Sequence, residues 1–160
     1  MTPRARIIGL GQALAMDDGV GLCVIDSLRA RAPAGDLELF TATDASALVA
    51  LLETPLPVVI VDAAIGEGTA GDLLLASPED LGTTTLSTLS SHGMGVVDAI
   101  KLARVLAPEA VAPSIRILAI CITPPRRYAV GLSQSARESV ARAVRALLDV
   151  DASDFSAQVR

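Results

Sequence analysis

Acidic side chains and a histidine stand at positions where their chemistry can combine. His92 is the only histidine in the chain and lies just before a predicted helix, within the loop 90–95. Asp17 and Asp18 follow the first predicted strand, and Asp62 closes the third. If the strands are parallel, these positions meet at the carboxyl edge of one sheet, where ligands bind in open α/β folds. Two carboxylates and an imidazole meeting there would form an open metal site.

The donor set indicates which ion such a site would take. Two carboxylates with one imidazole suit a borderline divalent ion such as nickel or zinc. Three protein ligands leave coordination positions for water or substrate. Each residue also has a simpler explanation. One of the Asp17–Asp18 pair can cap the first helix, Asp62 can accept hydrogen bonds from the next loop, and His92 can cap a helix or face solvent. The metal interpretation therefore requires that the three side chains converge.

Apolar runs and helical stripes alternate along the chain. We predict strands over residues 6–10, 37–40, 57–62 and 114–122, with an edge strand over 72–76. Helices are predicted over 19–32, from Asp44 to about Glu53, over 94–106, and from a cap at Ser133 or Ser135 to about Leu148, while 77–92 is predicted as loop. Ser135 with Glu138 fits a capping box. This alternation predicts an α/β fold, with a parallel or mostly parallel sheet covered by helices on both faces.

Composition narrows the classes of function. The 160 residues suggest one domain over 1–150, with 151–160 as a frayed tail. The net charge of −5 argues against nucleic acid. No apolar run is long enough for a membrane span, and the stretch 4–15 is too short and too broken by glycines for a signal peptide, so we expect a cytoplasmic protein. Cys23 and Cys121 form no Cys-x-x-Cys pair and are predicted to be small buried thiols.

Other catalytic and cofactor motifs fit poorly. The stretch 9–14 begins like a dinucleotide-binding fingerprint, but it lacks the third glycine, and no acidic residue ends the second predicted strand. There is no Gly-x-Ser-x-Gly elbow, no Walker A loop and no His-Glu-x-x-His pair in the sequence. The carboxylates and the histidine therefore remain the main candidates for chemistry.

Four segments spread over residues 6–148 have an order and spacing that are specific when taken together. They are 7–11 followed by 17–21, then 59–63, then 91–95, and finally 131–133 at the start of the last helix, with Pro124 shortly before. Through these segments the chain resembles the maturation endopeptidases of nickel–iron hydrogenases. The resemblance implies a three-layer helix/sheet/helix fold around a twisted, mostly parallel five-stranded sheet.

The resemblance also implies an activity and a site. Enzymes of this family remove a C-terminal extension from the hydrogenase large-subunit precursor after nickel insertion. By motif position, the family's metal ligands and catalytic residues fall on Asp18, Asp62 and His92, and Asp17 matches a less critical acidic neighbour. Nickel would be supplied by the substrate, held by its own cysteines, and another divalent ion could substitute in the free enzyme. Whether the ion polarises the scissile carbonyl, activates water, or an aspartate acts as acid or base stays open.

Two departures from the family pattern keep alternatives open. Many relatives carry Asn where this chain has Gln12, and many carry a Gly-Gly-Thr-like stretch where this chain has residues 40–44. A catalytically inactive binding protein of the same fold is therefore one alternative. A phospho-receiver module is another, because it too places acids after its first and third strands. A receiver needs a lysine after its fifth strand, where this chain has Thr123-Pro124-Pro125-Arg126-Arg127, and the two arginines are predicted to be a solvated loop.

Overall fold

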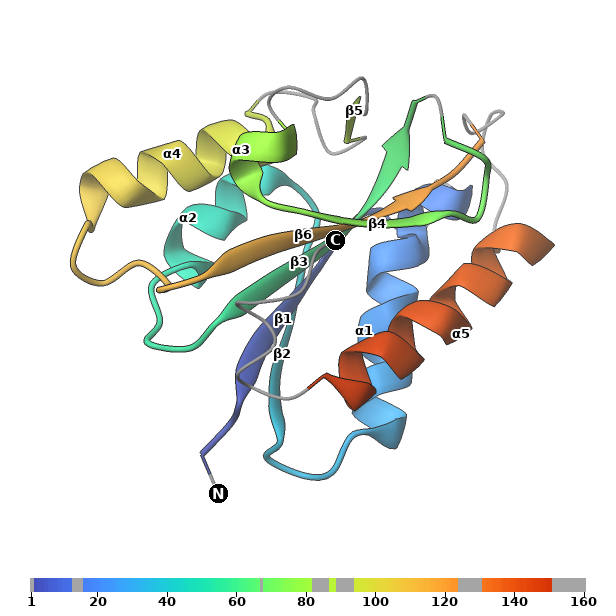
Figure 1. The fold of residues 1–160 in the computed structure, drawn as a ribbon, viewed down its shortest axis with the longest axis horizontal. Helices are drawn as coiled ribbons and strands as arrows, with labels where there is room; N and C mark the ends of the chain where they lie inside the picture. The colour runs from blue at the N-terminus through green and yellow to red at the C-terminus, as the bar shows by residue number, and fades with distance from the viewer. Residues whose placement is uncertain are drawn as a thin grey trace.

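The structure is a computed structural model that describes residues 2–12, 16–66, 68–81, 87–88, 94–123 and 131–150. Its strands are β1 (Ala5–Leu10), β2 (Leu37–Ala42), β3 (Val58–Ile65), β4 (Leu73–Ala76), β5 (Ser87–Thr88) and β6 (Ile115–Cys121) (Figure 1). Its α-helices are α1 (Val20–Arg31), α2 (Leu48–Leu51), α3 (Pro78–Leu81), α4 (Val96–Leu106) and α5 (Gln134–Asp149). Two short 3-10 helices, η1 (Met16–Gly19) and η2 (Ala45–Ala47), precede α1 and α2. No helix in these described ranges is both long and apolar enough to cross a membrane.

The sheet is mostly parallel, as the sequence predicts. Its main path has five strands in the order β2-β1-β3-β6-β4, and the first four of these run parallel. Strand β4 closes one edge and runs antiparallel to β6, while the two-residue β5 pairs antiparallel with the end of β3. Strand β3 is central because its consecutive β-branched residues 58–61 are buried on both faces.

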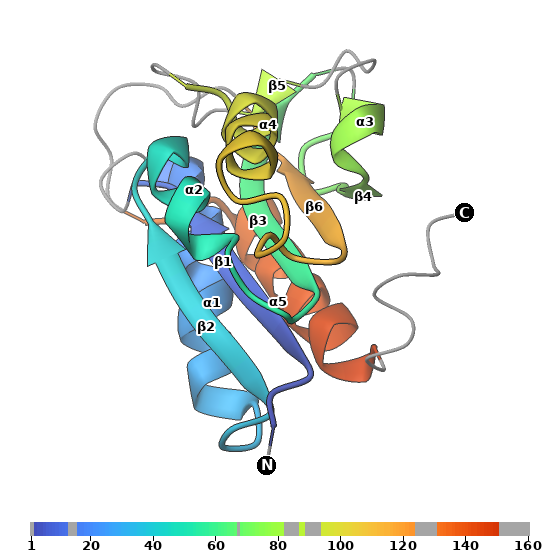
Figure 2. The same cartoon turned by 90° about the vertical axis from the view of Figure 1, so that its left-hand side faces the viewer.

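Helices cover both faces of the sheet, which confirms the expected three layers. Side chains alternate between the faces along each strand. Val59 and Val61 join a buried cluster with residues of α1 and α5, whereas Val58 and Ile60 join a second cluster with residues of α2 and α4. Figure 2 shows α1 and α5 on one side of the sheet and α2 and α4 on the other.

Helix α1 packs directly onto the sheet through two glycines. A Cβ atom at Gly21 would lie 2.3 Å from the carbonyl oxygen of Leu10 and 2.6 Å from that of Val61. A Cβ atom at Gly9 would lie 2.3 Å from the carbonyl oxygen of Gly21. These distances leave no room for a side chain, so the first turn of α1 rests on the backbones of β1 and β3. The preceding helix η1 is thereby brought into contact with β3.

The segment after β2 differs in part from the prediction. Asp44 does cap the next helix, since its Oδ1 accepts a hydrogen bond from the Ser46 amide at 2.9 Å. However, the capped turn is the 3-10 helix η2, and the α-helix that follows ends at Leu51 instead of Glu53. The chain turns away there because Glu53 forms a β-bridge with Val111.

Two further local predictions are wrong. Residues 77–92, predicted as loop, contain α3 and β5 within their described parts. Of the two predicted caps of α5, Ser133 is confirmed, since its Oγ accepts from the Ala136 amide at 3.2 Å, and the predicted capping box of Ser135 and Glu138 is therefore absent. Ser135 therefore lies inside the first turn. Both errors concern short features that depend on contacts with distant segments.

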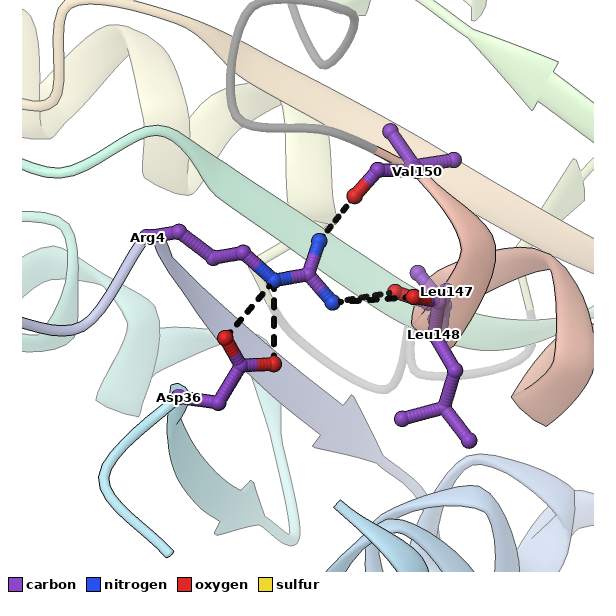
Figure 3. A network of polar contacts seen from close by, with 5 residues as sticks. All are labelled: Arg4, Asp36, Leu147, Leu148 and Val150. Carbon is purple, nitrogen blue, oxygen red and sulfur yellow. Dashed lines mark hydrogen bonds and ion pairs between the residues drawn. The ribbon is translucent and has the colours of Figure 1, made fainter. Parts of the chain in front are cut away.

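Arg4 ties together three segments at the amino edge of the sheet (Figure 3). Its Nε donates to Asp36 Oδ1 at 3.1 Å and to Oδ2 at 3.0 Å, just before β2. Its Nη2 donates to the carbonyl oxygens of Leu147 and Leu148, both at 3.2 Å, and its Nη1 donates to that of Val150. These carbonyls end α5 and have no partner within the helix. The single guanidinium thus connects β1, β2 and α5.

Arg4→Ala is expected to lower the free energy of unfolding by about 2–3 kcal/mol, because it removes several charge-assisted hydrogen bonds from partly buried groups. Urea unfolding followed by circular dichroism measures this change. Arg29→Ala is the matched control, since Arg29 pairs with Asp26 at 2.9 Å while both side chains are largely exposed. That control should change stability by no more than about 0.5 kcal/mol. Equal effects of the two substitutions would contradict the structural role of Arg4.

Candidate metal and catalytic site

Asp62 lies inside β3 and is fully buried. The prediction that it closes the strand is wrong by three residues, because β6 pairs with β3 as far as Ala64 and β5 pairs with it as far as Ile65, which extends the ladder. On the other side of β3, the pairing with β1 ends at Gly9 and Val61. Asp62 therefore still stands level with the carboxyl end of β1, as predicted. By alternation it points to the same face as Ile60, which is the face covered by α2 and α4.

Asp18 belongs to η1, in the loop that leaves β1. Its Oδ2 accepts a hydrogen bond from the Gln12 amide at 3.1 Å. This bond joins the residue that starts the loop to a residue at its end. Gly11 makes the turn possible, since it has φ +145° and a Cβ atom there would lie 2.1 Å from the Asp18 carbonyl oxygen. Because η1 contacts β3, the structure brings the segment carrying Asp18 against the strand carrying Asp62.

Asp17 is engaged elsewhere. Its side chain is buried, and its Oδ1 accepts from the Ser133 amide at 2.7 Å. Its Oδ2 accepts from Ser133 Oγ, also at 2.7 Å. The alternative that an aspartate caps α1 is wrong, because the N-cap is Gly19 and no side chain bonds there. The two neighbouring aspartates therefore have different partners, and Asp17 is the one bound to the N-cap of α5. Sequence reasoning missed Ser133 in this role, and the only signal for it was the motif 131–133.

His92 lies outside the described residues, as do Arg126 and Arg127. The described residues on either side of His92 pack against the sheet, one at the end of β3 and one on the face toward which Asp62 points. Thr88, four residues before His92, pairs with Ala64, two residues after Asp62. Helix α4 starts four residues after His92, and its Val96 joins the buried cluster on the Ile60 face. The predicted position of His92 thus stays a prediction, with the preceding flank at the expected edge and the following flank on the expected face.

The described donors fit a metal site only in part. Across the described ranges, no group of three His, Cys, Asp or Glu side chains is arranged to hold an ion. Asp17 is committed to Ser133, so Asp18 and Asp62 are the carboxylates that can supply oxygen donors. A third ligand has to come from outside the described residues. These two carboxylates match the oxygen donors of the predicted set, and the predicted imidazole of His92 lies outside the described residues.

The two cysteines do not provide a nucleophile. Cys121 is buried and Cys23 is partly buried, so the prediction of buried thiols holds for the first and partly for the second. Burial raises the pKa of both thiols, with a further increase from Asp72 near Cys121 and from Asp26 near Cys23. A thiol with a raised pKa stays protonated near neutral pH and is a poor nucleophile. The carboxylates therefore remain the candidate reactive groups among the described residues.

Comparison with known proteins is consistent in both sequence and fold. The family model described as "Hydrogenase maturation protease" matches residues 23–150. The [NiFe] hydrogenase maturation protease HybD from Thermococcus kodakarensis shares 21% identity with a TM-score of 0.72, and the match covers 92% of this chain and 97% of that one. The endopeptidase HycI from Escherichia coli shares 18% identity with a TM-score of 0.71, covering 95% of this chain and 94% of the other.

The hydrogenase maturating endopeptidase HybD from Escherichia coli gives a similar result. It shares 18% identity with a TM-score of 0.71, covering 92% of this chain and 90% of the other. No curated protein matches the sequence. At these identities the solved structures establish the fold, while the family model carries the relationship in sequence.

Proposed function

The chain belongs to the family of hydrogenase maturation proteases, and on this premise we propose that it removes the C-terminal extension of a nickel–iron hydrogenase large-subunit precursor after nickel insertion. It is a peptidase, because the enzymes of its family are peptidases. The observation that carries the finer proposal is the buried carboxylate of Asp62 in the central strand, beside the loop of Asp18. A charged group in that place has a high cost in free energy, and such sites are commonly functional.

We assign the metal-contacting and catalytic roles to Asp18, Asp62 and His92. Asp62 is held by the sheet ladder, which fixes its position along β3. Asp18 is oriented by the Gln12 amide, which donates to one of its oxygens. Support for His92 comes from its described flanks, because Thr88 pairs with Ala64 near Asp62 and Val96 joins the cluster on the face toward which Asp62 points. The three residues come from separate loops and strands, as a ligand-binding edge of an α/β sheet requires.

The nickel ion is part of the substrate in this proposal. Two carboxylates that face a substrate without a cation repel each other and lose solvation, so a nickel-free precursor is bound poorly. A precursor that carries the ion neutralises both carboxylates and shares its coordination sphere with the enzyme. The negative charges of Asp18 and Asp62 therefore make the enzyme bind the nickel-loaded precursor in preference to the nickel-free one before cleavage. When bound, the ion would polarise the scissile carbonyl group or activate the attacking water.

The phospho-receiver alternative has little support. The flavodoxin-like sheet of receiver proteins has the order 2-1-3-4-5 with parallel strands. Here the last strand of the path is β4, which comes before β6 in the chain and runs antiparallel to it. An inactive binding protein of the same fold remains the competing outcome, and the assay below decides between the two. Cytoplasmic action is part of the proposal, since free thiols at Cys23 and Cys121 suit a reducing compartment.

The test is a cleavage assay with a purified large-subunit precursor encoded near this protein, prepared with and without nickel. We expect mass spectrometry to show loss of the C-terminal extension from the nickel-loaded precursor alone. Equal cleavage of both forms would contradict the role of nickel. No cleavage of either form, with binding of the loaded precursor retained, would favour the inactive binding protein.

A further inference from the structure

The neighbouring residues Asp17 and Asp18 of the first loop form hydrogen bonds with different segments of the chain. Asp17 accepts two hydrogen bonds of 2.7 Å from Ser133, whereas Asp18 accepts one of 3.1 Å from Gln12. Only 6% of Asp17 is exposed. Consecutive residues in the tight turn η1 cannot move independently, so a fixed Asp17 also restricts the backbone of Asp18.

The partner of Asp17 is itself held firmly. Ser133 caps α5, and its Oγ also accepts from the Ala136 amide at 3.2 Å. Helix α5 packs against α1 and is tied to the loop before β4, because Ser139 Oγ donates to the Gly71 carbonyl oxygen at 2.9 Å. Ser139 is fully buried. The N-terminus of α5 is therefore a fixed point of attachment for η1.

The charge of Asp17 suits this attachment. The first turn of a helix presents free amides and a positive dipole end, which stabilise a carboxylate. Asp17 is thus compensated by α5, on the side of the sheet that α1 and α5 cover, while Asp62 points to the opposite face. Asp17 is not available as a ligand, and its role has to be exerted through Asp18.

We propose that Asp17 is a positioning residue, which holds η1 to the cap of α5 so that Asp18 keeps its orientation toward the metal-bearing substrate. The proposal rests on the proposed function for the part that concerns catalysis. Its structural part, the coupling of Asp17 to the loop closed by Asp18 and Gln12, can be measured without any substrate. Residues that orient metal ligands commonly alter activity by about 10–100-fold when replaced.

The first readout is hydrogen exchange of the Gln12 amide, which donates to Asp18. In Asp17→Ala we expect this amide to exchange at least about tenfold faster, because η1 is released from α5. Asp18→Ala defines the rate for a fully open loop. Ser133→Thr keeps both donors to Asp17 and should retain the wild-type exchange rate. Ser133→Ala keeps only the amide donor, so its exchange rate should lie between those of wild type and Asp17→Ala. In the double variant D17A/S133A the rate should equal that of D17A, since the two residues act through one link.

The second readout is cleavage of the nickel-loaded precursor. Asp17→Ala should lower kcat by about 10–100-fold with KM little changed. Asp36→Ala is the matched control, because it also removes an aspartate that joins distant segments, at the opposite edge of the sheet. It should reduce stability yet leave kcat and Gln12 exchange unchanged.

Unchanged Gln12 exchange in Asp17→Ala would overturn the proposal, and so would equal losses of kcat in D17A and D36A. If wild-type protein leaves the precursor uncut, the proposed function fails, and the exchange rates still decide whether Asp17 positions Asp18. The two failures are therefore distinguishable.

Discussion

Asp62→Asn is expected to reduce cleavage of the nickel-loaded precursor by at least about a thousandfold while the protein stays folded. The change keeps the size of a fully buried side chain but removes the negative charge that we propose meets the ion. A thousandfold loss corresponds to about 4 kcal/mol of transition-state stabilisation, which is the scale expected when a ligand of a charged centre is lost. Asp18→Ala and His92→Ala should have effects of the same order.

The measurement is single-turnover cleavage followed by mass spectrometry, with circular dichroism as the test of folding. Asp26→Asn is the matched control, because Asp26 is exposed on α1 and pairs only with Arg29 among the described ion pairs. It should cleave at the wild-type rate. Normal processing by D18A, D62N and H92A would contradict the site assignment.

Gly21→Ala is expected to destabilise the protein by more than about 3 kcal/mol or to prevent folding. A methyl group there would lie 2.3 Å and 2.6 Å from two backbone oxygens of the sheet, which cannot move without breaking the ladders of β1 and β3. Overpacking usually costs about 1–3 kcal/mol when side chains can adjust, and a backbone neighbour allows less adjustment. If the variant folds, η1 must shift, and precursor cleavage should fall with it.

Urea unfolding measures this effect, with Gly95→Ala as the control. Among the described residues, a Cβ atom at Gly95 would meet only the carboxylate of Asp98, at an ordinary 3.5 Å. Gly95→Ala should lower the free energy of unfolding by about 1 kcal/mol, the usual difference between glycine and alanine at a helix N-cap. A G21A protein as stable as G95A would show that α1 does not rest on the sheet backbone.

Much of the fold could be predicted because it follows from local patterns. The β-branched run at 58–61 identified the central strand, and the alternation of strands with helices identified a mostly parallel sheet. The extension of β3 beyond Asp62 could not be predicted, since it depends on pairing with β5 and β6. Short elements such as α3 and β5 carry too few residues to form a periodic pattern.

The sequence predicted the edge of the sheet at which the site lies, but not the contacts between its residues. The placement of Asp18 and Asp62 at one edge follows from parallel strands, and the structure brings their segments into contact. The link from Asp17 to Ser133 joins residues far apart in sequence, and no local spacing signals it. The position of His92, and the single domain over 1–150 with a tail at 151–160, stay predictions, because His92 and the tail lie outside the described residues.

The most direct test of the central claim is a crystal structure of the protein soaked with zinc and measured at the zinc absorption edge. We expect one anomalous peak with an oxygen of Asp18, an oxygen of Asp62 and a ring nitrogen of His92 each at about 2.0–2.2 Å. Zinc bound at another place, or these three side chains directed away from one another, would contradict the account.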